Sequence, residues 1–397
     1  MPEFLKKLEA AIQWRLKEAY LPPHRHKHRE WTHHDLQFFA KGADLLSTAF
    51  TEGRSVLPKN YFNKKEFRSA YLLYFVLQNF VKVWKCLEQL PLLCKEGAGE
   101  VPPEADQPLA EDLPHLTSPY KGEELKILDL GSGPGTAVLA CSAFFPDRPL
   151  EVFAFEQNEG SRKDALALWQ KLAPSHHRLT FTRNLVPREK VDIAIAANFL
   201  SELPFQEQLN ISASVLQRTR TFLIIEPALR VTTRKLMELR DKILEKHLGN
   251  ISAPCLHQKN CPMLAANPRD WCHFYIDWKC PQIIRQVDQL IGNKHDYLKM
   301  AYMIFEKRRY TSPLSPPYKG GEYWRVVSSP LISKGKREVI LCGDCGFLKK
   351  IDRLNKDRSD TNKSFDHIRR GDIIEWPDKP RVERTDTLKI TKKFSGS

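Results

Sequence analysis

The chain has 397 residues, of which 42% are apolar, and this is enough for more than one globular domain with a substantial core. Its 62 Lys and Arg residues outnumber its 48 Asp and Glu residues, and the resulting charge of +14 favours a polyanionic partner, nucleic acid above all. No apolar run approaches the roughly 18 residues of a membrane span, and no signal or transit peptide is apparent. We therefore expect a protein of the bacterial cytoplasm with no membrane contact.

Helices are predicted throughout residues 1–94, because apolar residues recur there at three- and four-residue spacing. The densest part is residues 61–90, whose aromatic residues at helical spacing are expected to be core: Tyr71, Tyr74, Phe75 and Phe80. In residues 23–34, histidines alternate with Lys and Arg, which favours a solvated or phosphate-facing segment over a metal site. Residues 95–124 are rich in Pro, Glu, Ala and Gly, and this composition predicts a flexible linker.

A buried strand, a glycine-rich turn and a helix are predicted in succession around the sequence KILDLGSGPGT. Gly131, Gly133 and Gly135 follow Asp129 at alternate positions, and their freedom to take positive φ lets the backbone turn sharply beside a ligand. The spacing differs from GxGxxG, and no Lys-Ser/Thr pair follows, which disfavours dinucleotide-binding and P-loop proteins. The next strand ends in Glu156, where a carboxylate can accept both hydroxyls of a ribose.

Strands and helices continue to alternate through residues 125–250, which predicts a parallel sheet with helices on both faces. One buried strand begins at Val191 and leads into a loop at Asn198. Together with the glycine loop and Glu156, this pattern resembles the cofactor-binding half of class I S-adenosylmethionine (SAM) methyltransferases. The resemblance implies a Rossmann-like domain over residues 125–250 that binds SAM through Asp129, Gly131, Ser132, Gly133, Gly135, Glu156 and Asn198.

Catalytic residues stay unassigned. The loop at Asn198 lacks the Asn or Asp-Pro-Pro-Tyr/Phe string by which many base-amino methyltransferases hold an exocyclic amine. The sequence therefore gives no methyl acceptor.

Six of the nine cysteines follow residue 254. Five, ten and seven residues separate the first four of them, and the last two form a CGDC string: Cys255, Cys261, Cys272, Cys280, Cys342 and Cys345. In a reducing compartment such a set indicates a metal site, and convergent thiolates select zinc or an iron–sulfur cluster. Zinc sites usually have tight spacings in both halves, so the wide first spacings favour a cluster. We predict a cysteine-rich metal-cluster region over residues 251–310.

The last part of the chain is predicted to hold a second linker over residues 311–322, followed by a basic, β-rich domain and tail over residues 323–397. The linker assignment rests on SPPYKGGEYW, which nearly repeats the SPYKGEE string at the end of the first linker. Short strand-like runs separated by basic turns fit either a small β domain or an extended tail, and the last twenty residues are expected to be loose.

At the level of a whole family, the chain resembles the mitochondrial small-ribosomal-subunit methyltransferase-like proteins and their bacterial relatives. The resemblance extends from about Tyr61 to Trp376 and rests on these strings, in this order: YLLYFVLQNFVKVW, LDLGSGPGT, FLIIEPAL, APCLHQKNCPM, DWCHF, RVVSSP and REVILCGDCG. It implies a helical N-terminal region, a class I methyltransferase domain, and an iron–sulfur cluster beside a small β domain. Three cluster ligands fall on Cys255, Cys261 and Cys272, and Cys342 matches the fourth best, with Cys280 and Cys345 as alternatives.

The leading interpretation is a monomeric methyltransferase-like protein that binds SAM and a 4Fe–4S cluster. It would act on the rRNA and proteins of the small ribosomal subunit during ribosome assembly or translation. Two alternatives stay open: an active, site-specific rRNA methyltransferase, and a zinc-stabilised RNA-binding module with a vestigial SAM pocket.

Overall fold

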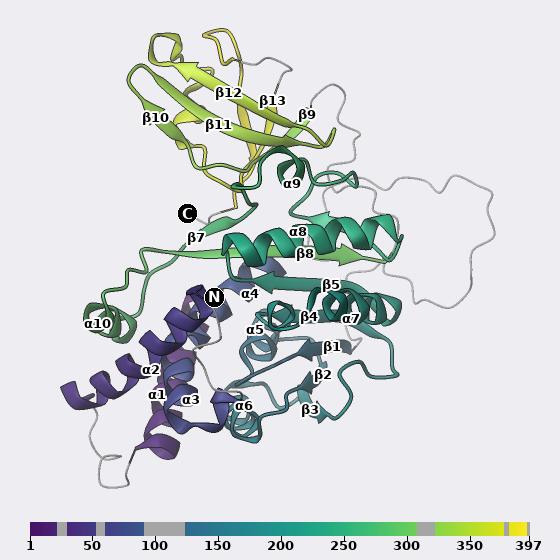
Figure 1. Cartoon of the computed structure of the whole chain (residues 1–397). Helices are drawn as coiled ribbons and strands as arrows, with labels where there is room; N and C mark the ends of the chain where they lie inside the picture. The colour runs from purple at the N-terminus through teal and green to yellow at the C-terminus, as the bar shows by residue number, and fades with distance from the viewer. Residues whose placement is uncertain (22–29, 53–59, 91–123, 308–321, 377–380, 395–397) are drawn as a thin grey trace, which may run out of the picture.

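The computed structural model describes residues 1–21, 30–52, 60–90, 124–307, 322–376 and 381–394 (Figure 1). The predicted linkers, apart from residues 124 and 322, and most of the histidine-rich segment lie outside these residues. The statements below concern the described part of the chain.

The N-terminal region is helical, as predicted. Its helices are α1 (Pro2–Tyr20), α2 (His33–Glu52), η3 (Tyr61–Asn63), α3 (Lys65–Tyr74) and α4 (Val76–Leu87). One face of α1 is buried, because Leu8, Ile12 and Leu16 recur at three- and four-residue spacing. Before α2, the Thr32 hydroxyl accepts a hydrogen bond from the Asp35 N–H at 3.2 Å, and the Asp35 carboxylate accepts one from the Thr32 N–H at 3.1 Å. This reciprocal pair caps the start of the helix.

A mostly parallel sheet forms the centre of the molecule. Its strand order is β3-β2-β1-β4-β5-β8-β6, with β7 paired to β8. The parallel part contains β1 (Leu125–Leu130), β2 (Leu150–Phe155), β3 (Arg178–Thr182), β4 (Val191–Ala197) and β5 (Thr219–Glu226). The remaining strands are β6 (Asn250–Ala253), β7 (Phe274–Asp277) and β8 (Tyr297–Glu306), and β8 runs antiparallel to β5, β6 and β7. The prediction of a Rossmann-like parallel sheet is confirmed by this order.

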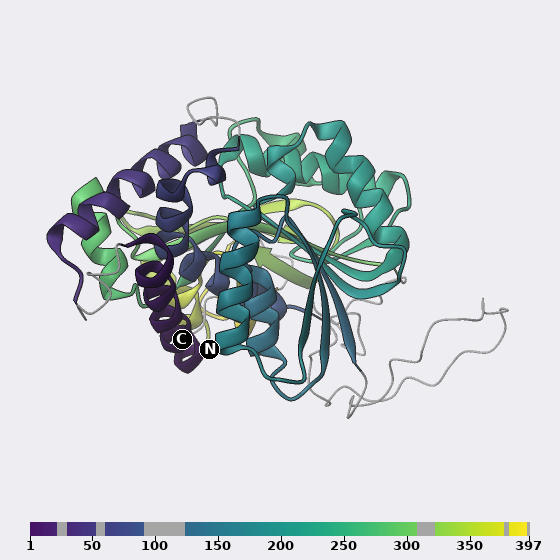
Figure 2. The same cartoon turned by 90° about the horizontal axis from the view of Figure 1, so that it is seen from below.

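Helices cover both faces of the sheet: α5 (Thr136–Phe144), α6 (Glu159–Leu172), α7 (Phe205–Arg218) and α8 (Arg230–Glu245). Successive residues of a strand point to opposite faces. Ile127 and Leu223 pack in one apolar core with α5, α6 and α1–α4, whereas Leu128 and Ile224 pack in a second core with α7 and α8. The N-terminal helices therefore extend the layer that α5 and α6 form, and the two groups lie side by side in the view from below (Figure 2).

A second, antiparallel sheet follows near the end of the chain and has its own apolar core. Its strand order is β10-β11-β9-β13-β14, with β12 paired to β11. The strands are β9 (Glu322–Val326), β10 (Leu331–Ser333), β11 (Lys336–Gly343), β12 (Leu348–Leu354), β13 (Ile373–Trp376) and β14 (Lys389–Lys392). In Figure 1 this sheet lies on the side of β8 and α8 away from the N-terminal helices.

The expectation of a loose C-terminal tail is wrong for the part of it that the structure describes. β14 pairs with β13, and the Phe394 ring packs on Phe274 at 5.0 Å and on Tyr302 at 5.7 Å between ring centroids. Both partners belong to the central sheet. The tail therefore ties the antiparallel sheet to the central one.

Candidate functional site

The glycine loop between β1 and α5 has the predicted backbone conformation. Gly131, Gly133 and Gly135 have φ of 71°, 52° and 85°, which is the left-handed region. At Gly131 a Cβ atom would lie 2.4 Å from the Phe199 ring, so only glycine fits there. At Gly133 a Cβ atom would meet nothing within 4 Å. The loop is thus tightly packed at its first glycine and open at its second.

Glu156 connects the end of β2 to this loop. Its carboxylate accepts a hydrogen bond from the Gly133 N–H at 2.8 Å and another from the Asn158 N–H at 2.6 Å. Burial raises the pKa of Glu156, and these two donors oppose that rise. A carboxylate has about four acceptor positions, so Glu156 keeps the capacity to accept hydroxyl groups as well.

Three buried polar atoms around the loop have no hydrogen-bond partner among the described residues: Asp129 Oδ2, Ser132 Oγ and Thr136 Oγ1. Asp129 is 1% exposed, and burial together with the nearby Glu156 charge raises its pKa to about 8. Unpaired buried polar atoms are costly, at about 1–3 kcal/mol each. Their grouping at the start of a helix that follows a glycine turn is typical of a ligand-binding site.

Asn198 lies at the carboxyl end of β4 beside the same loop. Its φ is 57°, and its N–H donates to the Ile225 carbonyl at 2.8 Å, which fixes the backbone across to β5. On the following turn, η5 (Leu200–Glu202), the Ser201 N–H donates to the Glu226 carboxylate at 3.1 Å. The predicted site residues of β1, β2 and β4 therefore gather at one edge of the sheet, where open α/β sheets bind ligands.

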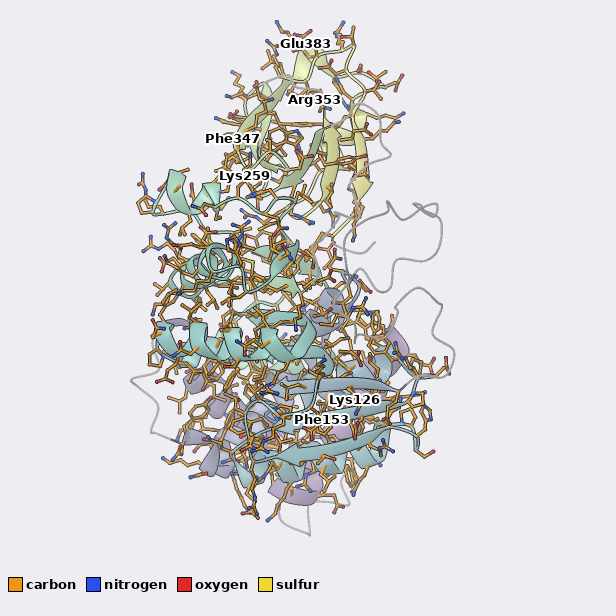
Figure 3. The ribbon with its side chains drawn as sticks, turned by 90° about the vertical axis from the view of Figure 1, so that its right-hand side faces the viewer. Lys126, Phe153, Lys259, Phe347, Arg353 and Glu383 are labelled. Atoms are coloured by element: carbon orange, nitrogen blue, oxygen red, sulfur yellow. The ribbon has the colours of Figure 1, made fainter. Side chains whose placement is uncertain are left out.

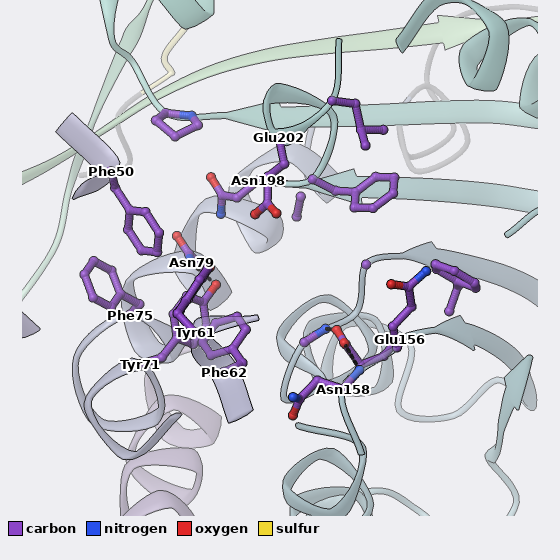
Figure 4. Close-up of a pocket in the computed structure, with 18 of the residues that line it drawn as sticks. Phe50, Tyr61, Phe62, Tyr71, Phe75, Asn79, Glu156, Asn158, Asn198 and Glu202 are labelled. Carbon is purple, nitrogen blue, oxygen red and sulfur yellow. Dashed lines mark hydrogen bonds between the residues drawn. The ribbon is translucent and has the colours of Figure 1, made fainter. Parts of the chain in front are cut away.

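A cavity of about 860 Å³ opens at this edge. Gly131, Gly133, Glu156 and Asn198 line one part of it. The opposite part is lined by side chains of the N-terminal helices, as Figure 4 shows. The volume is near the upper end of the range of about 300–1,000 Å³ that is usual for small-molecule sites.

The aromatic residues that were predicted to be core divide into two groups. Tyr74 and Phe80 are fully buried, as expected, whereas Tyr71 and Phe75 are half-buried and line the cavity. Sequence reasoning missed other lining residues of the same region: Phe50, Tyr61, Phe62, Asn79 and Lys82. The sequence shows that residues 61–75 are rich in aromatic residues. It does not show which of these side chains point into the core and which point into the cavity. Burial lowers the pKa of Lys82 to about 8.

Four of the predicted metal ligands pack around the second apolar core. Cys261 is buried in it, and Cys255, Cys272 and Cys342 pack against it. Burial, with the charges of the neighbouring Cys255 and Cys261, raises the pKa of Cys272 to about 12. Burial and the same cysteines, with Cys272, raise the pKa of Cys342 well above its usual range. The structure therefore brings together four cysteines from sequence positions that are almost ninety residues apart.

The other two cysteines of the predicted set lie elsewhere. Cys280 is near Asp288 and Arg285 of α10 (Gln282–Ile291), and Cys345 packs on the core of the antiparallel sheet. All cysteines of the described residues are free. Within these residues, no three His, Cys, Asp or Glu side chains are grouped so as to hold a single metal ion.

A buried arginine accompanies the four cysteines. The Arg240 side chain is fully buried, and it donates hydrogen bonds to the backbone carbonyls of His257 and Lys259. Although burial disfavours its charge, electrostatic interactions with Cys255 and with the Asp241 carboxylate keep the pKa of Arg240 raised. The loop that carries Cys255 and Cys261 thus wraps around a fixed positive charge.

The antiparallel sheet meets this loop directly. The Lys259 ammonium donates to the Cys345 carbonyl at 3.0 Å and lies 5.6 Å from the centre of the Phe347 ring (Figure 3). The Cys342 sulfur is 3.6 Å from Nε2 of His257. The four cysteines therefore lie where the two sheets join. Cys261 directly precedes α9 (Pro262–Ala266), which lies between α8 and the antiparallel sheet in Figure 1.

The sequence profile of a protein family described as "Mitochondrial small ribosomal subunit Rsm22" matches residues 121–375. The chain belongs to this family. The match spans the glycine loop and all four clustered cysteines, and it confirms the resemblance that the sequence strings indicated. No protein with a curated description matches this chain.

Solved methyltransferase structures are similar to part of the chain. Magnesium protoporphyrin IX methyltransferase of Synechocystis PCC 6803, with bound SAM, is 13% identical and has a TM-score of 0.29 over 46% of this chain and 70% of its own. TrmK of M. capricolum, in complex with S-adenosylhomocysteine, is 12% identical with a TM-score of 0.29 over 47% of this chain and 64% of its own. Likeness at this level carries no functional inference. The methyltransferase-type fold follows from the strand order and the glycine loop.

No described helix is long and apolar enough to cross a membrane.

The raised pKa of Asp129 predicts a pH dependence of stability. A carboxyl group whose pKa rises on folding binds its proton more tightly in the folded state, so its contribution to stability is full at low pH and is lost as pH rises towards about 8. Between about pH 5 and pH 8, the free energy of unfolding of the ligand-free protein should fall relative to that of Asp129→Asn by up to about 1.4 kcal/mol per pH unit.

Urea unfolding at several pH values measures this slope. Asp360→Asn is the matched control, because the Asp360 side chain is 99% exposed, and it should leave the slope of the wild-type protein unchanged. Parallel pH profiles for the wild-type protein and Asp129→Asn would contradict the assignment.

Proposed function

We propose that this chain binds SAM at the carboxyl edge of the parallel strands and acts as a methyltransferase-like protein on the small ribosomal subunit. The observation that carries the SAM site is the group of unpaired buried polar atoms at Asp129, Ser132 and Thr136 beside the open space at Gly133. The cavity there accommodates a ligand of this size. When bound, SAM supplies an electrophilic methyl group.

Each residue of the loop has a part in holding the cofactor. Asp129, Gly131, Ser132, Gly133 and Gly135 would surround its methionine end, because the start of α5 favours a carboxylate. Glu156 would accept the two ribose hydroxyls, and Asn198 would lie beside the methyl group that is transferred. The Phe199 ring packs on Gly131 and lines the cavity beside this part of the loop.

The chemistry of the clustered cysteines fits an iron–sulfur cluster. A tetrahedral metal ion bound at about 2.3 Å requires its sulfur ligands to lie about 3.8 Å apart. The described residues contain no such tight group, yet the four cysteines interact electrostatically with one another. The buried Arg240 interacts with three of them: Cys255, Cys261 and Cys342. In a 4Fe–4S cluster each thiolate binds a different iron atom, so the ligands stand farther apart. We propose Cys255, Cys261, Cys272 and Cys342 as its ligands, with Arg240 offsetting part of their negative charge.

Such a cluster would be structural. It would join the loop at residues 255–261 to β11, and so hold the antiparallel sheet against the central one. The charge of +14 supports small-subunit rRNA as a partner, and the family description supports ribosomal proteins of the small subunit as well. The bacterial cytoplasmic location and the monomeric state stay predictions from the sequence. A zinc-stabilised RNA-binding module with a vestigial SAM pocket is the alternative that the two experiments below address, and an active rRNA methyltransferase stays open as the other.

Calorimetric titration with SAM tests the cofactor site. The wild-type protein should give saturable heat, and Gly133→Arg should give none, because its side chain would fill the open space where the ligand belongs. Gly335→Arg is the matched control, since Gly335 also has positive φ and open surroundings but lies in the turn between β10 and β11. Equal heats from Gly133→Arg and Gly335→Arg would contradict the site, and absence of heat from the wild-type protein would favour a vestigial pocket.

Metal analysis of anaerobically purified protein tests the cysteine site. The wild-type protein should be brown and contain iron, and Cys272→Ser should lose most of the iron. Cys280→Ser and Cys345→Ser should keep it, because neither cysteine joins the other four in the structure. Cys141→Ser, at a buried cysteine of α5, controls for general loss of a thiol. A colourless protein with stoichiometric zinc would reject the iron–sulfur assignment.

A further inference from the structure

We propose that the part of the cavity beyond the glycine loop binds one unstacked nucleobase of single-stranded RNA, between aromatic rings of the N-terminal helices. This inference rests on the proposed SAM site, because it assigns the second ligand of the same cavity. It names the class of acceptor that neither the glycine loop nor the cysteines specify.

The cavity extends well beyond the residues assigned to SAM. Its lining continues from Gly133 and Glu156 across Asn198 to α2, η3, α3 and α4. In Figure 4 the aromatic side chains lie across the cavity from Glu156 and Asn158, with Asn198 and Glu202 between the two groups. A second ligand in this part would therefore face the proposed methyl position.

Five aromatic rings of α2, η3, α3 and the junction between α3 and α4 line that second part: Phe50, Tyr61, Phe62, Tyr71 and Phe75. They form a continuous group, with ring centroids 4.3 Å apart for Tyr61 and Phe62 and 5.1 Å apart for Phe62 and Tyr71. All five are half-buried, whereas Tyr74 and Phe80 of the same helices are fully buried. Rings that serve only the core would be buried like the latter two. Exposed aromatic faces in a cavity are the usual means of stacking an extruded base.

Side-chain amides accompany the rings. Asn198 forms no side-chain hydrogen bond with any described residue, and Asn79 uses one amide hydrogen on the Tyr71 hydroxyl at 3.2 Å. An amide offers both donors and acceptors, so these two side chains match the polar edge of a base. Lys82, whose ammonium is 3.3 Å from the Asn79 amide oxygen, adds a donor at the same wall.

A basic cavity adjoins this one and offers a path for the RNA backbone. It shares Asn63 and Asn158 with the main cavity, and its charged lining residues are Arg15, Lys65, Arg68, Lys163, Glu159 and Asp164. Arg15 pairs with Asp164 at 2.8 Å and Lys163 with Glu159 at 2.7 Å, but Lys65 forms no ion pair with any described residue. Basic side chains outnumber acidic ones in this adjoining cavity, which favours binding of the phosphates on either side of an inserted base. The same charge disfavours a basic ribosomal-protein segment as the occupant.

Photo-crosslinking tests the proposal directly. The probes are unstructured RNA strands of about 12 nucleotides, each with one thiouridine or thioguanosine, in the presence of S-adenosylhomocysteine. Mass spectrometry should map the crosslink to peptides that contain Tyr61, Tyr71 or Phe75. Phe75→Leu, which keeps an apolar side chain but removes the ring, should lose this crosslink and bind RNA at least about fivefold more weakly. It should give the same SAM heat as the wild-type protein.

Phe38→Ala is the matched control, because Phe38 is an exposed aromatic residue of α2 that does not line the cavity, and it should behave like the wild-type protein. Crosslinks only outside the cavity, or unchanged crosslinking by Phe75→Leu, would overturn the proposal. So would crosslinking of these rings to ribosomal-protein peptides instead of RNA. Failure of the SAM titration with intact crosslinks would remove the proposed function and leave the base-binding site, so the two failures are distinguishable.

Discussion

The shared apolar core of the N-terminal helices and the central sheet is the constraint on which the site depends. α4 packs on α5 and β8 within the same core as the inward side chains of β1, β4 and β5. Because this packing fixes α3 and α4 beside the sheet edge, the half-buried rings of Tyr71 and Phe75 line the same cavity as the glycine loop. Without these helices the loop would open onto a shallow edge of the sheet. With these helices, the loop forms part of a cavity that has polar residues around the glycine loop on one side and aromatic rings on the other.

A second constraint acts at the other side of the sheet. There a buried arginine is surrounded by carbonyl groups of the loop that carries two of the clustered cysteines, and a third cysteine comes from β11 of the antiparallel sheet. Burying a charge is tolerable only when it is paired and hydrogen-bonded. Arg240 therefore offsets part of the rise that burial causes in the pKa of Cys261 and Cys342. A cluster in that position would hold the two sheets together outside the cavity, whose lining contains none of the four cysteines. This separates a structural role for the cysteines from any chemistry at the glycine loop.

The sequence was most informative where local rules dominate. Alternating glycines after a buried strand predicted the loop and its positive φ, and residue periodicity predicted the helical start and the parallel sheet. It was least informative about long-range packing. Tyr71 and Phe75 line the cavity whereas Tyr74 and Phe80 are buried, and this difference depends on which face of each helix meets the sheet. The packing of Phe394 depends on partners more than ninety residues earlier in the chain. Spacing also could not choose among the last three cysteines, because Cys342 joins the others only through the folded position of β11.

These features converge on one claim, that a single cavity holds a cofactor at the glycine loop and an acceptor against the aromatic wall. The most direct test is an experimental structure of the protein saturated with S-adenosylhomocysteine. We expect the ribose hydroxyls at Glu156, the amino-acid end along residues 129–135, and the sulfur atom facing Asn198 and the rings of Tyr71 and Phe75. Density for the ligand at any other place, or an empty cavity at saturating ligand concentration, would contradict the account.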